Sequence, residues 1–385
     1  MKAPERVLVA LDHEEPDFVP AFESTFTNDS IVRRTGHKPT HFGDLVRALR
    51  FLPFRHSLMR RALCDPRLVA RGLLPLAKFY RAVGLDLLPT VMALFPREIR
   101  KGGFVDEFGR VMRFEYYQDG TEVIGYVGGI FSSFEDYEAW EQPDPDWDAR
   151  LAGVRAGFEV QGELDDEVFV MPATTGVMEV TWEGFGIERF SRLLARPKQA
   201  RRVFDDRGKF AVETVKAAAD EGARLVLVFD DYGYKKGLFM SPANYRRYVF
   251  PWLKKVCDAA HKRDCKVMLH SDGDLSEVVD EIVRDCGVDA LNPIEPTTAN
   301  PNWDVFKLGE RLGNEVTLAG NVSPVALATG TAEEVAEYTE ELIRRLAPGG
   351  GYVLASGHSI NPAVKWELWK AMMDARERMG RYPIR

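Results

Sequence analysis

Acidic and histidine side chains directly follow several short apolar segments in the second half of the chain. Asp230 and Asp231 come after one such segment, and His270 and Asp272 come after the next. Because alternate side chains of an extended backbone point to the same face, His270 and Asp272 are expected to project together. The sequence thus places imidazole and carboxylate groups where they can share one pocket.

Glu295, Asn321 and His358 hold the same place after three later apolar segments. Two imidazoles with one or two carboxylates suit Zn²⁺ or another divalent metal, because such ions accept both neutral nitrogen and anionic oxygen ligands. The predicted metal ligands are His270, Asp272, Glu295 and His358. The alternative is that these side chains bind a polar substrate directly or hydrogen-bond the loops around them.

The side chains at these segment ends divide into two further predicted roles. A carboxylic acid or an imidazole in such a place can transfer a proton. The candidate catalytic residues are therefore Asp230, Asp231 and His358. The candidate substrate-binding residues, which offer a phenol, a cation and an amide, are Tyr232, Lys235 and Asn321. For either aspartate the alternative is that it only ties its own loop.

The segments that position these residues repeat one plan from about residue 221 onward. A run rich in Val, Leu and Ile precedes a polar turn and then an amphipathic pattern of helical period, which is typical of parallel βα units. The predicted strands are Arg224–Phe229, Lys266–His270, Asp289–Pro293, Val316–Gly320 and Gly351–Ala355. The predicted helices are Ala243–Lys262, Leu275–Asp285, Val305–Arg311, Ala332–Leu346 and Ala363–Met379.

Three upstream segments, Phe18–Phe22, Leu85–Thr90 and Val168–Pro172, bring the predicted strands to the number that closes a (β/α)8 TIM barrel. Reactive residues past the C-terminal ends of barrel strands face the substrate. We predict a single α/β domain, residues 1–385, with a helical insertion at about 40–83 and a β-hairpin insertion at about 100–165. A doubly wound open sheet is the alternative, although no Gly-rich phosphate-binding motif follows any predicted strand.

The composition excludes several classes of protein. The 385 residues are 45% hydrophobic, which is enough to bury a large core. A net charge of −8 disfavours nucleic acid as a partner. No segment approaches the roughly 18 apolar residues that cross a bilayer, so we expect no membrane partner. The four cysteines have no CxxC spacing and favour neither a disulfide framework nor a thiolate zinc cluster, which fits a cytoplasmic protein.

Three segments carry a resemblance to the uroporphyrinogen decarboxylase superfamily, which includes decarboxylases and corrinoid-linked methyltransferases. The N-terminal segment contains Arg6-Val-Leu and Pro16-Asp-Phe-Val-Pro20. Gly320-Asn-Val-Ser-Pro324 is similar to the family's GN(L/V)DP motif, and Gly357-His-Ser-Ile360 is similar to its GHGI motif. The resemblance spans nearly the whole chain and implies the same barrel, with His358 as the motif histidine.

The chain departs from true decarboxylases at two places. They carry an arginine-rich segment after the first strand and an aspartate near the second strand that binds the pyrrole nitrogens. This sequence reads Pro20-Ala-Phe-Glu-Ser-Thr-Phe-Thr-Asn28 and Leu85-Asp-Leu-Leu-Pro-Thr90 there. Without the arginines, the many carboxylates of a tetrapyrrole would be poorly compensated. We therefore expect that uroporphyrinogen is not the substrate.

Thiol-activating methyltransferases of the superfamily hold zinc with His-x-Cys and a later Cys, and the corresponding residues here resemble His270-Ser-Asp272 and His358. Carboxylate and imidazole ligands make a bound metal a harder Lewis acid that is less suited to a thiolate. The resemblance therefore favours an enzyme that moves a methyl group from an O- or N-methyl donor to a corrinoid carried by a partner protein, assisted by a metal or by a protonated acid.

Two other functions remain open at this point. A decarboxylase acting on a tetrapyrrole or a smaller carboxylic acid would use His358 and an aspartate as proton donors and needs neither metal nor corrinoid. A non-catalytic barrel would bind a small molecule without turnover. By analogy with the superfamily, a homodimer is expected.

Overall fold

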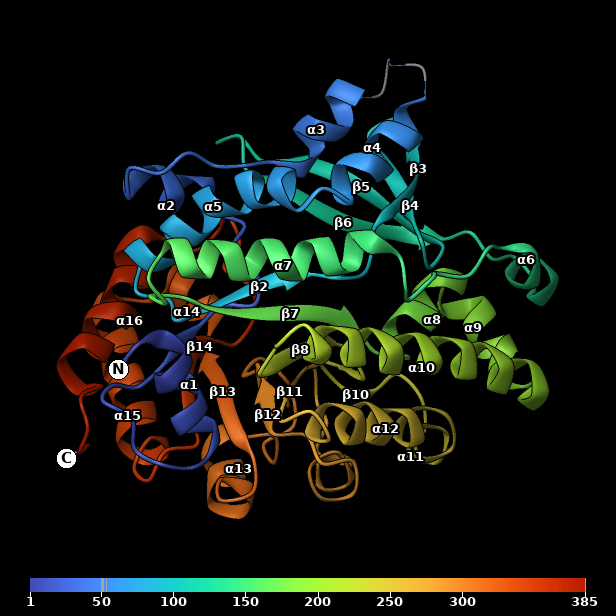
Figure 1. Cartoon of the computed structure of the whole chain (residues 1–385). Coiled ribbons are helices and arrows are strands. Elements are labelled where there is room, and N and C mark those ends of the chain that lie inside the picture. Colours follow the sequence, from blue (N-terminus) through green and yellow to red (C-terminus); the bar gives the residue numbers. More distant parts are fainter. Residues whose placement is uncertain (50–51, 53, 385) are drawn as a thin grey trace.

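Eight parallel strands form the central sheet of the protein, as seen in a computed structural model that describes every residue except 50, 51, 53 and 385. Around the sheet the strands are β1 (Ala21–Phe22), β2 (Leu87–Val91), β7 (Phe169–Thr175), β8 (Leu225–Phe229), β11 (Lys266–His270), β12 (Ala290–Asn292), β13 (Thr317–Val322) and β14 (Tyr352–Ser356). The backbone N–H of Asp86 donates to the carbonyl oxygen of Ala21 (2.8 Å), which joins β2 to β1. The predicted (β/α)8 barrel is confirmed (Figure 1).

The register of the strands places their C-terminal ends at the same height along the barrel axis. His270 at the end of β11 pairs with Phe229 at the end of β8 and with Asn292 at the end of β12. Val322 at the end of β13 pairs with Ser356 at the end of β14. Residues that follow these strands therefore emerge at one end of the barrel, which we call the mouth.

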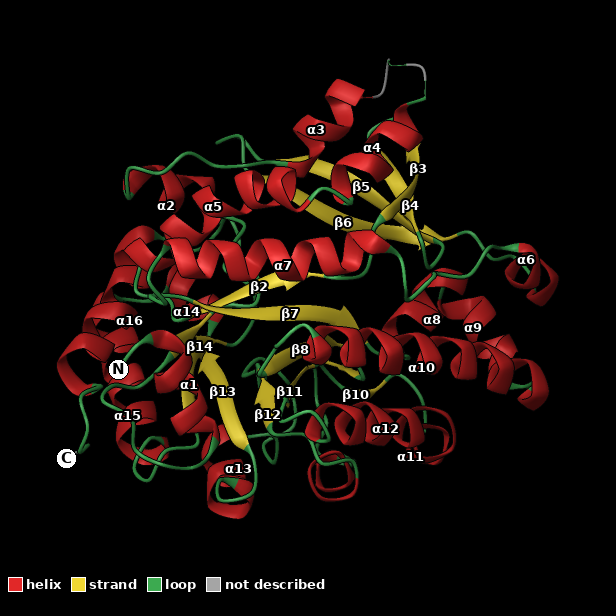
Figure 2. Ribbon diagram, in the orientation of Figure 1, coloured by secondary structure: helices red, strands yellow, loops and turns green. Residues whose placement is uncertain are grey.

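Helices surround the sheet and cover its outer face (Figure 2). The helices packed along the barrel are α5 (Pro66–Ala82), α7 (Asp148–Glu163), α10 (Pro197–Asp220), α12 (Phe250–His261), α13 (Val305–Leu312), α15 (Ala332–Leu346) and α16 (Trp366–Met379). The shorter helices are α2 (Asp29–Arg34), α3 (Phe42–Leu49), α4 (Arg55–Leu63), α6 (Phe134–Ala139), α8 (Glu179–Phe185), α9 (Ile187–Leu194), α11 (Pro242–Asn244) and α14 (Pro324–Thr329). Two π-helical turns are η1 (Tyr245–Val249) and η2 (Glu281–Asp285).

The N-terminal helix α1 (Ala3–Leu11) closes the end of the barrel opposite the mouth, which we call the floor. Its apolar side chains Ala3, Val7 and Leu11 are buried in one cluster with residues of the barrel strands such as Leu87 and Met268. The interior of the barrel is thus a packed core between its two ends.

The two insertions differ in part from the prediction. The helical stretch is three helices, of which α5 belongs to the barrel while α3 and α4 stand outside it (Figure 1). The expected β-hairpin is an antiparallel sheet of four strands, β3 (Pro96–Arg100), β4 (Gly103–Asp106), β5 (Arg110–Tyr116) and β6 (Glu122–Gly129). The predicted helix Leu275–Asp285 begins late, because the Asp274 carboxylate accepts from the N–H of Ser276 and forms a turn there.

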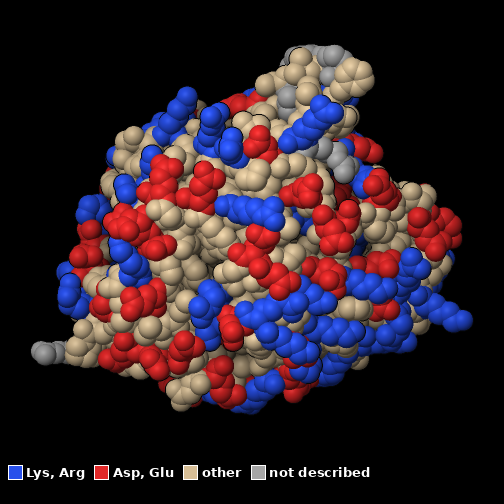
Figure 3. All heavy atoms as spheres, in the orientation of Figure 1, with Lys and Arg blue, Asp and Glu red and all other residues tan. Residues whose placement is uncertain are grey.

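Two strands form a small hairpin beyond β8: β9 (Gly233–Tyr234) and β10 (Gly237–Leu238). Lys and Arg side chains gather at the lower right of the face shown in Figure 3, over α10 and α12, and charges of both signs are mixed over the rest of this face. Among the described residues, no helix has both the length and the apolar character that crossing a bilayer requires.

Candidate active site at the barrel mouth

Three side chains at the ends of β8 and β11 form the centre of the candidate site. One potential ligand atom from each of Asp231, His270 and Asp272 lies within 4.8 Å of the other two. The loops that follow β8 and β11 are joined, because the backbone N–H of Asp272 donates to Oδ1 of Asp231 (2.8 Å). The predicted convergence of His270 and Asp272 is therefore present, and Asp231 joins them.

Hydrogen bonds of Asn292 fix the orientation and the tautomer of His270. The Nδ2 group of Asn292 donates to the carbonyl oxygen of Ala319 (3.0 Å), so its Oδ1 must face Nδ1 of His270, 2.6 Å away. Nδ1 therefore carries a proton, and Nε2 lies on the side of Asp272, whose Oδ1 is 3.9 Å away. This is the arrangement of a metal-binding histidine with its supporting carbonyl.

Asp272 has one satisfied oxygen and one unsatisfied oxygen. Its Oδ2 lies 3.0 Å from Nε2 of His358, whereas its Oδ1 is buried without a hydrogen-bond partner. Burial pushes the pKa of Asp272 upward, but the hydrogen bond to His358 and the charges of His270 and His358 outweigh it and lower the pKa. An ionised oxygen that is buried and unpartnered is costly, and a cation bound beside it would remove that cost.

His358 lies after β14 and contacts the site through Asp272. The N–H of Ser359 donates to Nδ1 of His358 (2.8 Å), so the proton resides on Nε2, which faces Asp272. The hydrogen bond to Asp272 raises the pKa of His358. His358 is about half exposed and can exchange its proton with a substrate.

Glu295 supports the loop of Asp272 and is not in the group of three. Its Oε2 accepts from the N–H of Gly273 (3.0 Å), and its Oε1 accepts from the hydroxyl of Thr297. Gly273 is itself required there, because its φ is +87° and a Cβ would lie 2.3 Å from the backbone of Tyr234. The group of three thus contains His270 and Asp272 of the four predicted ligands together with Asp231, and the ligand roles of Glu295 and His358 stay predictions.

Asp230 and Tyr232 serve the framework. The carboxylate of Asp230 accepts from the backbone N–H groups of residues 177, 178 and 179 at 2.8 to 2.9 Å, which caps the start of α8. The ring of Tyr232 is fully buried and packs against Tyr245 and Phe250. The predicted substrate contact of Tyr232 is corrected, since its side chain has no access to the mouth, and these contacts give Asp230 a structural role.

Asn321 and Lys235 lie at opposite extremes of exposure. Asn321 is buried, donates to the carbonyl oxygen of Ile294 (2.9 Å) and accepts from the hydroxyl of Tyr338 (2.8 Å). Both ends of its amide are thus engaged by the protein. Lys235 is exposed between β9 and β10, and its substrate-binding role stays a prediction.

Sequence reasoning missed Glu23, which follows β1 directly. It accepts from the backbone N–H of Ser356 (2.9 Å) and from its hydroxyl (2.5 Å). Burial raises the pKa of Glu23 to about 8, although the two bonds from Ser356 and the charge of His358 oppose the shift. The other site residues were predicted because each is a polar side chain just past a strand. Glu23 directly follows the predicted strand Phe18–Phe22, so the same rule would have found it.

Glu179 was also missed, and no local signal marks it. Burial, and then the charge of Glu183, raise the pKa of Glu179 to about 8. Arg110 from the insertion sheet reaches the Oε1 atom of Glu179 (3.3 Å) and the Oε2 atom of Glu183 (2.7 Å). Burial, followed by the charges of Glu179 and Asp272, raises the pKa of Asp231 well above its usual value. The mouth therefore holds several carboxyl groups that stay protonated near neutral pH.

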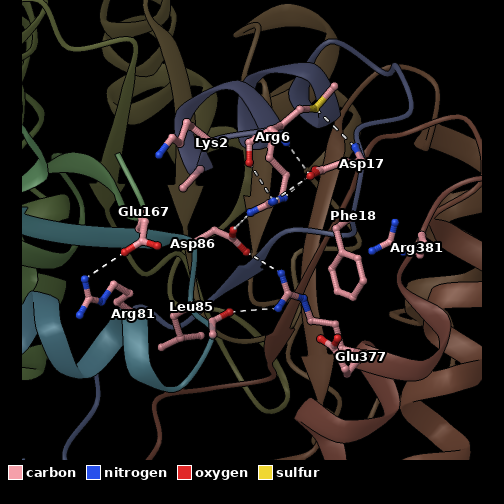
Figure 4. A pocket seen from close by; sticks show the side chains of 14 residues that line it. Lys2, Arg6, Asp17, Phe18, Arg81, Leu85, Asp86, Glu167, Glu377 and Arg381 are labelled. Atoms are coloured by element: carbon pink, nitrogen blue, oxygen red, sulfur yellow. Dashed lines mark hydrogen bonds and ion pairs between the residues drawn. The ribbon is translucent and has the colours of Figure 1, made fainter. Parts of the chain in front are cut away.

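The floor of the barrel contains a cavity of a different kind, with a volume of about 580 Å³ (Figure 4). Arg6 lies there between two carboxylates, Asp17 (2.8 Å) and Asp86 (2.7 Å). Arg376 from α16 donates to the other oxygen of Asp86 (2.7 Å). In a barrel of this type the floor contributes to stability and the mouth to chemistry, so the cavity is not the candidate active site.

The chain belongs to the uroporphyrinogen decarboxylase family, whose model matches residues 115–379. It is 25% identical to a uroporphyrinogen decarboxylase from Thioalkalivibrio sulfidiphilus over 62% of this chain and 67% of that protein. It is 26% identical to the enzyme of the same name from Synechococcus sp. over 56% of this chain and 61% of that protein. The matches thus span about two thirds or less of these relatives.

A solved structure has the same fold over nearly the whole chain. It is described as a methyltransferase from Methanosarcina mazei, with a TM-score of 0.68 and 20% sequence identity. The alignment covers 98% of this chain and 99% of that one. The superfamily that the sequence motifs indicate is confirmed, and the family and the fold point to an enzyme of that superfamily.

Proposed function

We propose that the protein is a methyltransferase that moves a methyl group from an O- or N-methyl donor to a corrinoid carried by a partner protein. The observation that carries the proposal is the group of Asp231, His270 and Asp272, in which a buried carboxylate oxygen of Asp272 lacks a hydrogen-bond partner. Nitrogen and oxygen donors without a thiolate suit the activation of an oxygen or nitrogen leaving group better than that of a thiol.

The same three residues would hold a divalent metal, of which Zn²⁺ fits the donor set well. Nδ1 of His270 donates to Asn292, which leaves Nε2 on the side of Asp272, and the hydrogen bond from His358 lowers the pKa of Asp272 although burial opposes it. When bound, the metal supplies Lewis acidity toward the heteroatom of the donor. His358 and Glu295 lie around this group, one bonded to Asp272 and the other to Gly273.

The protein's own acids would complete the reaction by supplying a proton. As the methyl carbon leaves, the heteroatom keeps the electron pair of the broken bond and becomes more basic. His358 is suited to protonate it, because its hydrogen bond to Asp272 raises its pKa. Glu179, a carboxyl whose pKa burial raises to about 8, is a second proton source beside Asp231.

Decarboxylation of a carboxylic acid is the second candidate, and Glu23 is the observation that favours it. Loss of CO₂ leaves a carbanion that must be protonated, and a buried acid with a pKa of about 8 beside His358 can do this. The named relatives that match by sequence are uroporphyrinogen decarboxylases. This reaction needs neither the metal nor the corrinoid.

The test combines metal analysis with a methyl-transfer assay. The purified chain is incubated with a reduced corrinoid protein and a panel of methyl ethers and methylamines, and methylation of the corrinoid is followed by its absorbance. We expect transfer with at least one donor and close to one metal ion per chain. Release of CO₂ from carboxylic acids by metal-free protein would instead establish the second candidate.

Variants separate the ligands from the rest of the protein. His270→Ala and Asp272→Ala are expected to lose the metal and the transfer activity together. His261→Ala is the matched control, because His261 also bonds an aspartate (Asp289, 2.8 Å) but lies outside the mouth. Full metal content in the His270→Ala and Asp272→Ala variants would contradict the proposed site.

A further inference from the structure

The helical layer formed by α3, α4 and α5 is basic, although the chain as a whole is acidic. Residues 42–82 contain nine Lys or Arg and two Asp or Glu, a formal charge of +7. The whole chain carries −8, so the remaining residues carry −15. The layer is thus one of the basic parts of an acidic protein.

The same layer exposes large apolar side chains at its outer end. Phe54 is 81% exposed, and the neighbouring leucines are between 41% and 47% exposed: Leu45, Leu52, Leu58 and Leu68. They account for five of the fourteen exposed large apolar side chains of the described residues. Single exposed apolar residues are ordinary, but a group of this kind on one projection marks an interaction surface.

The arginines around this apolar group are not neutralised within the chain. Arg55, Arg61, Arg67 and Arg71 form no ion pair with any residue that the structure describes. In the same layer Arg47 pairs with Asp44, and Arg81 pairs with Glu167. The unpaired charges therefore cluster with the exposed leucines.

The inner side of the layer is firmly packed, so its outer side is free. Val46 of α3 and Met59 of α4 are buried in a small core with Ile99, Phe104 and Phe114 of the insertion sheet. The helices thus rest on the sheet through one apolar face and turn a second apolar face outward. Figure 1 shows α3 and α4 at the extreme end of the molecule, away from the barrel.

We propose that this layer binds the surface of an anionic lipid bilayer, with Phe54 and the exposed leucines inserted among the acyl chains and the unpaired arginines at the phosphate groups. Helices that lie in a membrane interface combine these two features. Each basic side chain near an anionic surface contributes about 1 kcal/mol, which corresponds to about a fivefold gain in binding.

A bilayer fits this surface better than a second copy of the chain. In a twofold-symmetric dimer the same patch meets itself, so Arg55, Arg61, Arg67 and Arg71 would face their own copies. The apolar side chains also project outward, and a rigid protein would need a matching hollow to receive them. A fluid interface has no such requirement. The expectation of no membrane partner rested on the lack of a spanning segment, which binding at the surface does not need.

Vesicle sedimentation with the full chain tests this proposal. The vesicles consist of phosphatidylcholine alone or of phosphatidylcholine mixed equally with phosphatidylglycerol. We expect binding to the mixed vesicles that weakens as salt is added, and little binding to phosphatidylcholine alone. Arg61→Gln with Arg67→Gln should lower the partition coefficient about 25-fold, and Phe54→Ser with Leu58→Ser should abolish stable binding.

The matched control variant is Val325→Ser with Arg344→Gln, which removes one exposed apolar side chain and one exposed arginine elsewhere. It should bind like the unaltered protein, and circular dichroism should give all variants the same melting temperature. Equal binding to both kinds of vesicle would overturn the proposal, as would equal binding by the control and the Phe54 variant. A dimer in solution that the Phe54 variant dissociates would assign the surface to a second copy instead.

Discussion

The two ends of the barrel both bury charged side chains, but they balance the charges differently. At the floor, Asp86 bonds two guanidinium groups, those of Arg6 and Arg376. At the mouth, Asp231 and Asp272 face imidazoles and each other, and an oxygen of Asp272 has no partner.

This contrast separates charges that hold the fold from charges that are kept for chemistry. A buried carboxylate with two arginine partners is fully compensated, and removing any member leaves an isolated charge. At the mouth, burial and then the charges of Glu179 and Asp272 raise the pKa of Asp231, and such a group costs stability. Such a cluster is retained where it can bind a cation or transfer a proton.

The largest expected effect is on stability at the floor. Asp86→Ala leaves Arg376 buried without a counter-ion, so we expect the free energy of unfolding to fall by about 3–5 kcal/mol. Urea denaturation followed by circular dichroism measures it. The matched control is Asp374→Ala in α16, which removes an exposed pair with Lys370 and should cost less than about 1 kcal/mol. An equal fall in the free energy of unfolding in the two variants would contradict the stabilising role of the buried network at the floor.

At the mouth, a variant of one carboxylate should affect metal binding and leave the fold intact. Asp231→Asn removes a ligand, and we expect zinc affinity to fall at least about 100-fold. The same change relieves repulsion from Glu179 and Asp272, so the metal-free variant should be as stable as the unaltered protein or more stable. Competition with a chromogenic chelator gives the affinity. A metal-free variant that unfolds as readily as Asp86→Ala would show that Asp231 holds the fold.

The buried acid Glu23 should make stability depend on pH. Its pKa is about 8 in the folded protein and 4.5 ordinarily, so the unfolded chain loses this proton first as the pH rises. The contribution of Glu23 is therefore full below about pH 4.5 and is lost as the pH approaches 8. We expect Glu23→Gln to gain about 2 kcal/mol relative to the unaltered protein between pH 5 and pH 8, less than the roughly 5 kcal/mol that the full shift allows. Urea denaturation at both pH values measures it, and an unchanged difference would contradict the burial effect.

The smallest expected effect is on a single titration. Asp272→Asn removes the carboxylate that raises the pKa of His358, so this pKa should fall toward its ordinary value. An NMR titration of the imidazole signals follows it. His261, whose pKa is raised by Asp289, serves as the internal reference and should not move. An unaltered His358 titration would mean that the contact between His358 and Asp272 does not form in solution.

The strands that carry the site could be predicted because their signal is local. The strand Lys266–His270 is predicted and observed with the same bounds. Its centre is the apolar run Val, Met and Leu, and turn-forming segments flank it on both sides. The rule that strand ends face the mouth then placed Asp231, His270 and Asp272 together.

The remaining parts of the site depend on contacts between distant segments. Glu179 lies four residues beyond β7, and its position depends on α8 and on Arg110 from the insertion sheet. Tyr232 was misassigned because neighbouring residues of one loop turn to opposite sides, one into the core and one to the mouth. Neither fact is encoded in local spacing.

The network at the floor has a consequence for how the protein is made. Asp86 receives its bonds from Arg6 and from Arg376, which is synthesised 290 residues after it. A ribosome-bound chain that lacks α16 has only half of this charge compensation, and a chain that also lacks β14 has no partner for its first strand. The cylinder can therefore close only after β14 and α16 have been synthesised, and the growing chain must remain unaggregated until then.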